Sequence, residues 1–130
     1  MRIWTMRSDG ADKRQVTTGA GAADVQPAWS PDGQTIAFQR SGSAIFGDLW
    51  LVDSDGGRER GLLPAPLPGP QWAPAWSPDG QLIAFASQHE TYGSGSGTSQ
   101  IYTAWADGSK LARRTFGEVE AGRPGWLIRE

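Results

Sequence analysis

The stretch Gly93–Gly97, GSGSG, resembles the nucleophile elbow of serine hydrolases in its composition. That elbow, G-x-S-x-G, needs a serine at its centre on a strand-to-helix turn, but the central residue here is Gly95. A Ser-His-acid triad also needs its three groups to be brought together beside an oxyanion hole. The chain has one histidine, His89, and no sequence around it provides a helix or an oxyanion hole. The residues therefore predict no catalytic group, and we expect that the chain is not an enzyme.

The sequence DSDG at 53–56 imitates the start of a calcium-binding loop. It lacks the third acidic position and the distant bidentate glutamate of such loops. The related turns at 8–10 and 106–108 keep only one aspartate, which suits the tight turn of a hairpin. Because the chain also has no cysteine, we expect neither a metal nor a cofactor.

The composition excludes several classes of partner. The net charge is −2 and the charges are scattered, so no basic stripe predicts nucleic-acid binding. No stretch approaches the roughly 18 apolar residues of a membrane span, and the N-terminus is not a signal peptide. The 18 Gly and 9 Pro indicate many turns, whereas the 7 Trp need a core or a stacking surface. Many turns with many large hydrophobic residues predict short strands and an all-β protein.

The chain contains an internal repeat. PAWSPDGQTIAF at 27–38 recurs as PAWSPDGQLIAF at 74–85, with only Thr35 replaced by Leu82. A second unit that ends in Asp-Gly occurs three times, at 2–10, 48–56 and 100–108. A degenerate third copy of the first unit, RPGWL, lies at 123–127. The period is therefore about 46–52 residues, and this repeat decides the architecture.

Each period is expected to contain four strands. Pro31 and Gly33 suit a tight turn that joins PAWS to TIAFQ as a hairpin. LWLVD and IYTAW are rich in the branched and aromatic residues that strands favour, and a short fourth segment follows each. Leu49 and Leu51 point to one face and Trp50 to the other, so both faces are apolar and need a cover. Four strands per period with two buried faces predict a β-propeller blade.

The fold class that we predict is a fragment of a β-propeller with about 2.5–3 four-stranded antiparallel blades. A homodimer would complete a six-bladed ring, with the last strand of one chain, around 123–128, joining residues 2–16 of the other. The predicted boundaries are a blade remnant at 1–18, full blades at 24–63 and 72–116, and a terminal strand at 122–130.

The pattern P-A-W-S-P-D-G-Q-x-I-A-F, followed by a strand ending in D-G, resembles the TolB-type propeller repeat, a relative of the WD-type repeats. Segments 26–62 and 73–115 carry this resemblance. It implies six blades and a periplasmic parent protein, which would be a non-catalytic protein-binding scaffold in a Tol-Pal type envelope assembly. The repeat is also similar to the substrate-gating propellers of prolyl-oligopeptidase-like peptidases, whose hydrolase domain would be missing here, and to ligand-sensing propellers of bacterial regulators. The fold does not choose between these functions.

The loops that alternate with the short turns are long and unlike one another, at 41–47, 63–71 and 88–99. In an up-and-down blade they share one face of the ring, and variable loops on a uniform scaffold are where binding usually lies. The alternative is that they are ordinary solvated loops whose aromatic residues fill the loop bases. The predicted contacts with a protein partner are Phe46, Trp72, His89, Glu90 and Tyr92.

Five of the seven tryptophans, together with Tyr102, recur at the blade period, which is simplest to explain if they are core residues. One series is Trp29, Trp76 and Trp126, and the other is Trp4, Trp50 and Tyr102. Trp72 and Trp105 lie outside both series, and Trp72, between prolines, is the better candidate for an exposed contact.

Overall fold

The computed structural model describes residues 1–19, 23–42, 47–65, 67–89, 93, 97–117 and 122–127. These residues form ten strands and no helix, and every strand pair is antiparallel. The all-β prediction is therefore confirmed.

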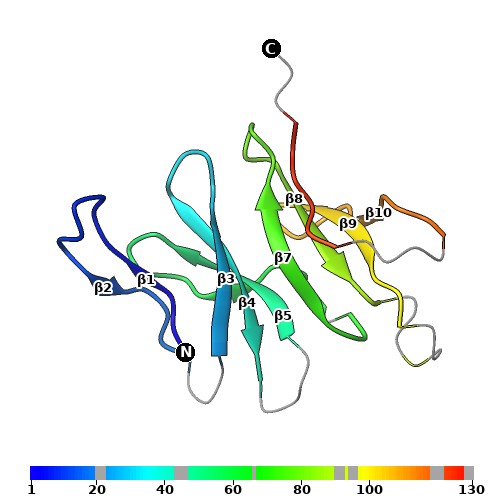
Figure 1. Cartoon of the computed structure of the whole chain (residues 1–130), viewed down its shortest axis with the longest axis horizontal. Helices are drawn as coiled ribbons and strands as arrows, with labels where there is room; N and C mark the ends of the chain where they lie inside the picture. The colour runs from blue at the N-terminus through cyan, green and yellow to red at the C-terminus, as the bar shows by residue number, and fades with distance from the viewer. Residues whose placement is uncertain are drawn as a thin grey trace.

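The strands form three sheets that stand side by side in chain order (Figure 1). The first hairpin consists of β1 (Trp4–Thr5) and β2 (Arg14–Gln15). The middle sheet consists of β3 (Ala23–Trp29), β4 (Thr35–Ser41), β5 (Gly47–Asp53) and β6 (Arg60–Gly61). The last sheet consists of β7 (Gln71–Trp76), β8 (Leu82–Ser87), β9 (Gln100–Trp105) and β10 (Ala112–Arg113). In both four-stranded sheets the spatial order is the chain order, as in a propeller blade.

The predicted hairpin turns are present in both four-stranded sheets. Gly33 and Gly80 have positive φ angles of 70° and 72°, which a residue with a side chain rarely adopts. The Gly33 amide donates to the Ser30 carbonyl at 2.9 Å, and the Ser30 hydroxyl donates to the Asp32 carboxylate at 2.6 Å. That hydroxyl, together with the Gln34 amide, holds the pKa of Asp32 below its usual range. The sequence SPDG thus forms a tight turn that is stabilised by hydrogen bonds among its own residues.

The short turns lie together on one face of the molecule. The Ser54 amide donates to the Gln34 carbonyl at 2.8 Å, which joins the β5–β6 turn to the β3–β4 turn. The Ala106 amide makes the same bond to the Gln81 carbonyl at 2.9 Å in the last sheet. The long loops leave the strands at the opposite end, which we call the long-loop end. The arrangement that the repeat predicts is therefore present.

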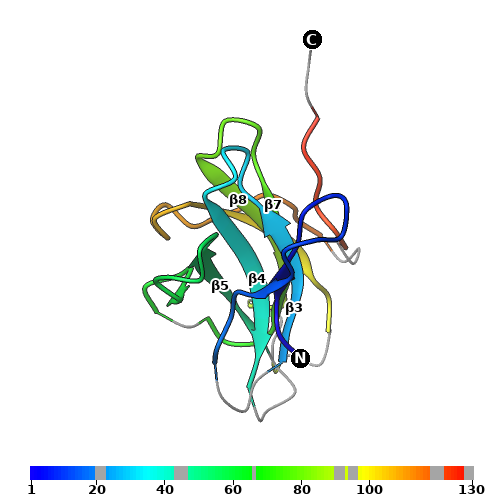
Figure 2. The ribbon, with the colours of Figure 1, turned by 90° about the vertical axis from the view of Figure 1, so that its left-hand side faces the viewer.

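Two apolar layers separate the three sheets, which stack behind one another in Figure 2. Leu49 and Leu51 of β5 lie in the layer between the middle and last sheets, whereas Val52 and Trp50 face the first hairpin. The prediction that both faces of this strand are apolar is confirmed. The first layer contains Ile3, Val16, Ile36, Phe38 and Val52. The second contains Ala37, Leu49, Leu51, Leu62, Ile83, Phe85, Tyr102 and Ala104.

The tryptophan series are less buried than the repeat predicts. Tyr102 is 2% exposed, but Trp4 and Trp29 are 59% and 51% exposed, so the expectation that they are core residues is wrong. A residue on a blade face is buried only where a neighbouring segment covers it. Trp29 borders an open cleft between β3 and the first hairpin, so its ring stays largely exposed.

The predicted terminal strand, 122–130, is described only over 122–127, and these residues form no strand. A strand exists only through backbone pairing with a neighbour, and the described residues supply no pairing neighbour here. The segment nevertheless occupies a defined place beside β7, because the Trp126 indole donates to the Ala75 carbonyl at 3.0 Å.

Glycine in the β9–β10 turn is required by the neighbouring sheet as well as by its own φ angle. A Cβ on Gly108, which has a φ of 82°, would lie 2.1 Å from the Leu62 carbonyl oxygen. A Cβ on Gly10, which has a φ of 84° in the corresponding turn of the first hairpin, would meet nothing within 4 Å. We expect Gly10→Ala to destabilise the fold by about 1 kcal/mol through φ alone. Gly108→Ala should destabilise it by at least about 2 kcal/mol more, because backbone must move apart.

Urea unfolding of the two variants and the wild type measures this difference. Equal losses in Gly10→Ala and Gly108→Ala would show that the last sheet does not pack this closely on the middle one.

Candidate partner-binding surface

The structure describes two of the five predicted partner contacts. Trp72 lies on β7, pairs with Ala86 and is partly buried. His89 follows β8, and its ring packs edge-on against Tyr102 with a centroid distance of 6.2 Å. Both residues lie at the long-loop end of the β7–β8 pair, where the Gln88 amide also donates to the Pro70 carbonyl at 3.3 Å. The other three predicted contacts lie outside the described residues: Phe46, Glu90 and Tyr92.

His89 lies at the base of its loop, just after β8. Its amide donates to the Ser87 hydroxyl at 3.0 Å, and its Nδ1 atom is buried. Among the described residues this nitrogen has no hydrogen-bond partner. The ring packs against Tyr102, and its contact with a partner remains a prediction.

A cleft of about 230 Å³ crosses the three first-strand segments, by which we mean β3, β7 and residues 122–127. Equivalent positions of the repeat line it, as Gln26-Pro27, Ala73-Pro74 and Arg123-Pro124. The prolines recur because each precedes the Trp of its repeat by two residues, whereas the residue before each proline changes. The cleft thus combines a uniform proline lining with one amide and one exposed guanidinium group.

The strands β3 and β7 each contain a bulge beside this cleft. Gln26 and Ala73 have positive φ angles of 53° and 52°, and the pairing register shifts beside each of them. A non-glycine residue in this conformation costs about 1–2 kcal/mol, and an extra residue bends a strand locally. The Gln26 side-chain carbonyl accepts a hydrogen bond of 2.8 Å from the Ala73 amide. The bulges of neighbouring sheets are therefore tied directly to each other.

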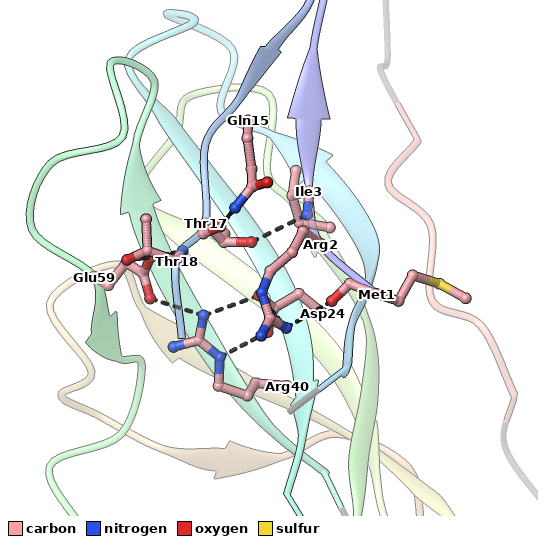
Figure 3. Close-up of polar contacts among 9 residues, drawn as sticks. All are labelled: Met1, Arg2, Ile3, Gln15, Thr17, Thr18, Asp24, Arg40 and Glu59. Carbon is pink, nitrogen blue, oxygen red and sulfur yellow. Dashed lines mark hydrogen bonds and ion pairs between the residues drawn. The ribbon is translucent and has the colours of Figure 1, made fainter. Parts of the chain in front are cut away.

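An ion-pair network lies at the long-loop end between the first hairpin and the middle sheet (Figure 3). Arg40 on β4 donates through Nε to Asp24 on β3 at 2.6 Å, and its Nη2 pairs with Glu59 at 2.7 Å. The Asp24 side chain is fully buried, and Arg2 lies 3.9 Å from its second oxygen. Two carboxylates thus converge on one guanidinium group, and we call these four residues the Arg40 network.

Arg40 is enclosed by aromatic rings and backbone. Its guanidinium carbon lies 4.7 Å from the ring centre of Trp50 and 5.1 Å from that of Phe38. Rings at such distances attract a cation through their negative faces. A Cβ on Gly19 would lie 2.6 Å from the same carbon, so any side chain there would displace the Arg40 guanidinium group.

The Arg40 network fixes Thr17 and Thr18, which follow the first hairpin. The Thr18 amide and hydroxyl both donate to Glu59, and the Thr17 hydroxyl accepts from the Ile3 amide at 3.0 Å. This network was not predicted from the sequence. Alignment of the two repeats could have indicated it, because the charged residues Asp24 and Arg40 correspond to the neutral Gln71 and Ser87 in the last sheet.

The network lowers the pKa values of its carboxyl groups. Burial acts to raise the pKa of Asp24, but hydrogen bonds from Arg40 and Thr17 outweigh it and hold that pKa below the ordinary 3.8. Burial likewise opposes ionisation of Glu59, and the hydrogen bonds from Thr18 and Arg40 hold its pKa below 4.5. Both groups are therefore ionised at neutral pH, where their charges balance those of Arg40 and Arg2.

The described part of the chain has no helix that could cross a bilayer. Nor do its His, Asp and Glu side chains gather in threes around a place that could hold a metal ion.

TolB proteins are found both among the curated relatives and among the solved structures that resemble this chain. No protein-family model matches the chain. It is 39% identical over 73 residues to the Tol-Pal system protein TolB of Zymomonas mobilis and 41% identical over 76 residues to that of Rhizorhabdus wittichii. Each match covers 54% of this chain, but only 15% and 16% of the relatives. The solved structure of a protein assigned as TolB from Agrobacterium tumefaciens superposes with a TM-score of 0.70 at 29% identity. That match covers 89% of this chain and 38% of the other.

The chain is therefore a partial TolB-like β-propeller, as its repeat predicts. It spans about a sixth of the length of the curated relatives.

The lowered pKa of Asp24 predicts a pH-dependent stability. A carboxyl group whose pKa is lower in the folded state stabilises the fold above its ordinary pKa, and this contribution disappears as the pH falls through the folded pKa. We expect Asp24→Asn to destabilise the fold by about 2 kcal/mol at pH 7, because charge-assisted hydrogen bonds are lost. The difference from wild type should shrink as the pH falls from about 5 to below 3.

Urea unfolding at several pH values measures this difference, with Asp12→Asn, an exposed residue, as the control. A loss in Asp24→Asn that does not vary with pH would contradict an ionised Asp24 in the network.

Proposed function

We propose that this propeller segment is a non-catalytic scaffold that binds a partner protein along its first-strand segments and at its long-loop end. The cleft across the three first-strand segments is the observation that carries the proposal. We further propose that the parent protein is periplasmic and acts in an envelope assembly of the Tol-Pal type. The support for this step is the naming of the curated relatives as Tol-Pal system proteins, at 39% and 41% identity.

The chemistry of the cleft suits an extended polypeptide. The Pro27 and Pro74 rings give it an apolar lining, and the exposed Arg123 guanidinium group offers donors for a carboxylate or a carbonyl. Trp72 adds a large ring at the same end of β7, and partly buried tryptophans often carry much of the binding energy of an interface. In this proposal Phe46, His89, Glu90 and Tyr92 complete the surface, as the sequence predicts.

The bonds that form the surface also favour a rigid scaffold. The Arg40 network anchors β3 through Asp24, and the Gln26–Ala73 bond links the neighbouring bulges. A surface held in this way does not have to be ordered when the partner binds, which favours affinity. Since the packing of His89 against Tyr102 is structural and no nucleophile elbow is present, we propose binding without turnover.

The proposal includes self-association. The chain holds two four-stranded sheets and one hairpin, and a homodimer in which the chains share blades would approach a six-bladed ring. Closure of this kind would cover the exposed Trp4 and Trp29 side chains.

Substitution of Trp72 tests the binding surface. We expect Trp72→Ala to weaken binding to the purified Pal protein of the relatives' Tol-Pal system by at least about tenfold, as loss of an interface tryptophan does. Trp105→Ala is the matched control, because Trp105 lies beside the short β9–β10 turn at the opposite end of the sheet. Titration calorimetry measures both affinities.

Two results would contradict the proposed surface. One is an affinity that Trp72→Ala leaves unchanged. The other is a loss of affinity in Trp72→Ala that only follows unfolding, shown by a drop in stability of several kcal/mol, as truncation of a core aromatic residue causes.

A further inference from the structure

One hydrogen bond recurs between neighbouring first-strand segments. The Trp76 indole donates to the Ala28 carbonyl at 3.1 Å, and the Trp126 indole donates to the Ala75 carbonyl at 3.0 Å. In both cases the acceptor is the residue just before the tryptophan of the preceding repeat. The bond forms even though 122–127 is not a strand, so it does not depend on strand pairing. A first-strand segment can therefore donate from its indole to the segment before it and accept at its backbone carbonyl from the segment after it.

Trp29 is the first member of this series and has no acceptor among the described residues. Its side chain is 51% exposed. It borders an open cleft against the first hairpin, which is lined by Thr5, Met6, Arg7, Asp12, Arg14 and Trp29. Met6 is also 64% exposed, so the cleft presents apolar surface beside the unused indole donor. The place that a preceding first-strand segment would occupy is open within the described chain.

Gly125 carries the complementary group. It stands just before Trp126, where Ala28 and Ala75 stand in their repeats, and it is exposed. Within the described part of the chain its carbonyl accepts no hydrogen bond from a further indole. A Cβ at this position would meet nothing within 4 Å, so the surroundings of Gly125 are open. The adjacent Leu127 is 90% exposed and adds apolar surface.

We propose that the cleft beside Trp29 binds residues 123–127 of a second copy of this chain, and that the Trp29 indole donates to the Gly125 carbonyl of that copy. This inference rests on the proposed self-association and names its contact. Every chain has one such donor and one such acceptor, and in a six-bladed ring two chains make the contact twice about a two-fold axis.

The interfaces within the chain favour a second copy over an unrelated protein as the occupant. The segment that fits beside a tryptophan of this series is, in both observed cases, another first-strand segment of the same repeat. Residues 123–127 are such a segment, and their outer side is exposed. The contact between copies therefore continues an interface that the chain already forms twice.

Sedimentation velocity from about 1 to 200 μM tests the contact. We expect the wild type to form a dimer and Trp29→Phe, which keeps an aromatic ring but loses the N–H donor, to raise the dimer dissociation constant about tenfold or more. Trp105→Phe is the matched control and should leave the constant unchanged. Gly125→Ala should also dimerise normally, because Ala28 and Ala75 occupy the equivalent positions.

The outcomes separate the contact from the proposals on which it rests. If the wild type dimerises and Trp29→Phe does so equally well, the named contact is wrong and self-association stands. A wild type that stays monomeric at 200 μM overturns both self-association and the contact, while partner binding keeps its own calorimetric test. Thermal unfolding checks that Trp29→Phe folds as stably as the wild type, as expected for a half-exposed side chain.

Discussion

The middle sheet of this protein has two apolar faces and cannot bury both of them alone. The alternation along β5 shows the constraint directly, because Leu51 faces the last sheet and Val52 faces the first hairpin. Burial of apolar surface is the main favourable contribution to folding, so the middle sheet depends on its neighbours. The packing is close enough for backbone contact, since a Cβ on Gly56 would lie 3.1 Å from the Val16 carbonyl oxygen. This dependence explains why the sheets stack and why their turns contact the neighbouring sheet. It also explains why a face without a neighbour stays exposed.

Local chemistry explains how much of the fold could be predicted from the sequence. The turn at 30–33 and its copy at 77–80 follow from Pro, Asp and Gly at fixed positions, and the structure contains both. Whether Trp29 is buried depends instead on a segment of another repeat, which a local pattern does not include. Residues 122–127 of the strand predicted at 122–130 form no strand for the same reason, because a strand needs a pairing neighbour. The Arg40 network was missed since its members are far apart in the sequence.

The differences between repeats indicate where the scaffold is specialised. Positions that build the blade are the same in both sheets, such as the tryptophans at 29 and 76 and the turn that follows each. The residue before each cleft proline changes, and an ion pair at 24 and 40 replaces the neutral side chains of the other sheet. Both differences lie on the bulged first strands or at the long-loop end. A fold that hosts many functions acquires each of them at sites of this kind, which is why the binding surface is proposed there. The five predicted partner contacts all remain predictions: Phe46, Trp72, His89, Glu90 and Tyr92.

The mutual dependence of the sheets can be measured by native-state hydrogen exchange on Phe85→Leu. Phe85 is fully buried on β8, in the layer between the middle and last sheets. If neither sheet is stable without the other, loss of about 1 kcal/mol at this position should lower amide protection by the same factor in β4 and β5 as in β8 and β9. Protection that falls in β8 and β9 while β4 and β5 keep their wild-type values would contradict the account.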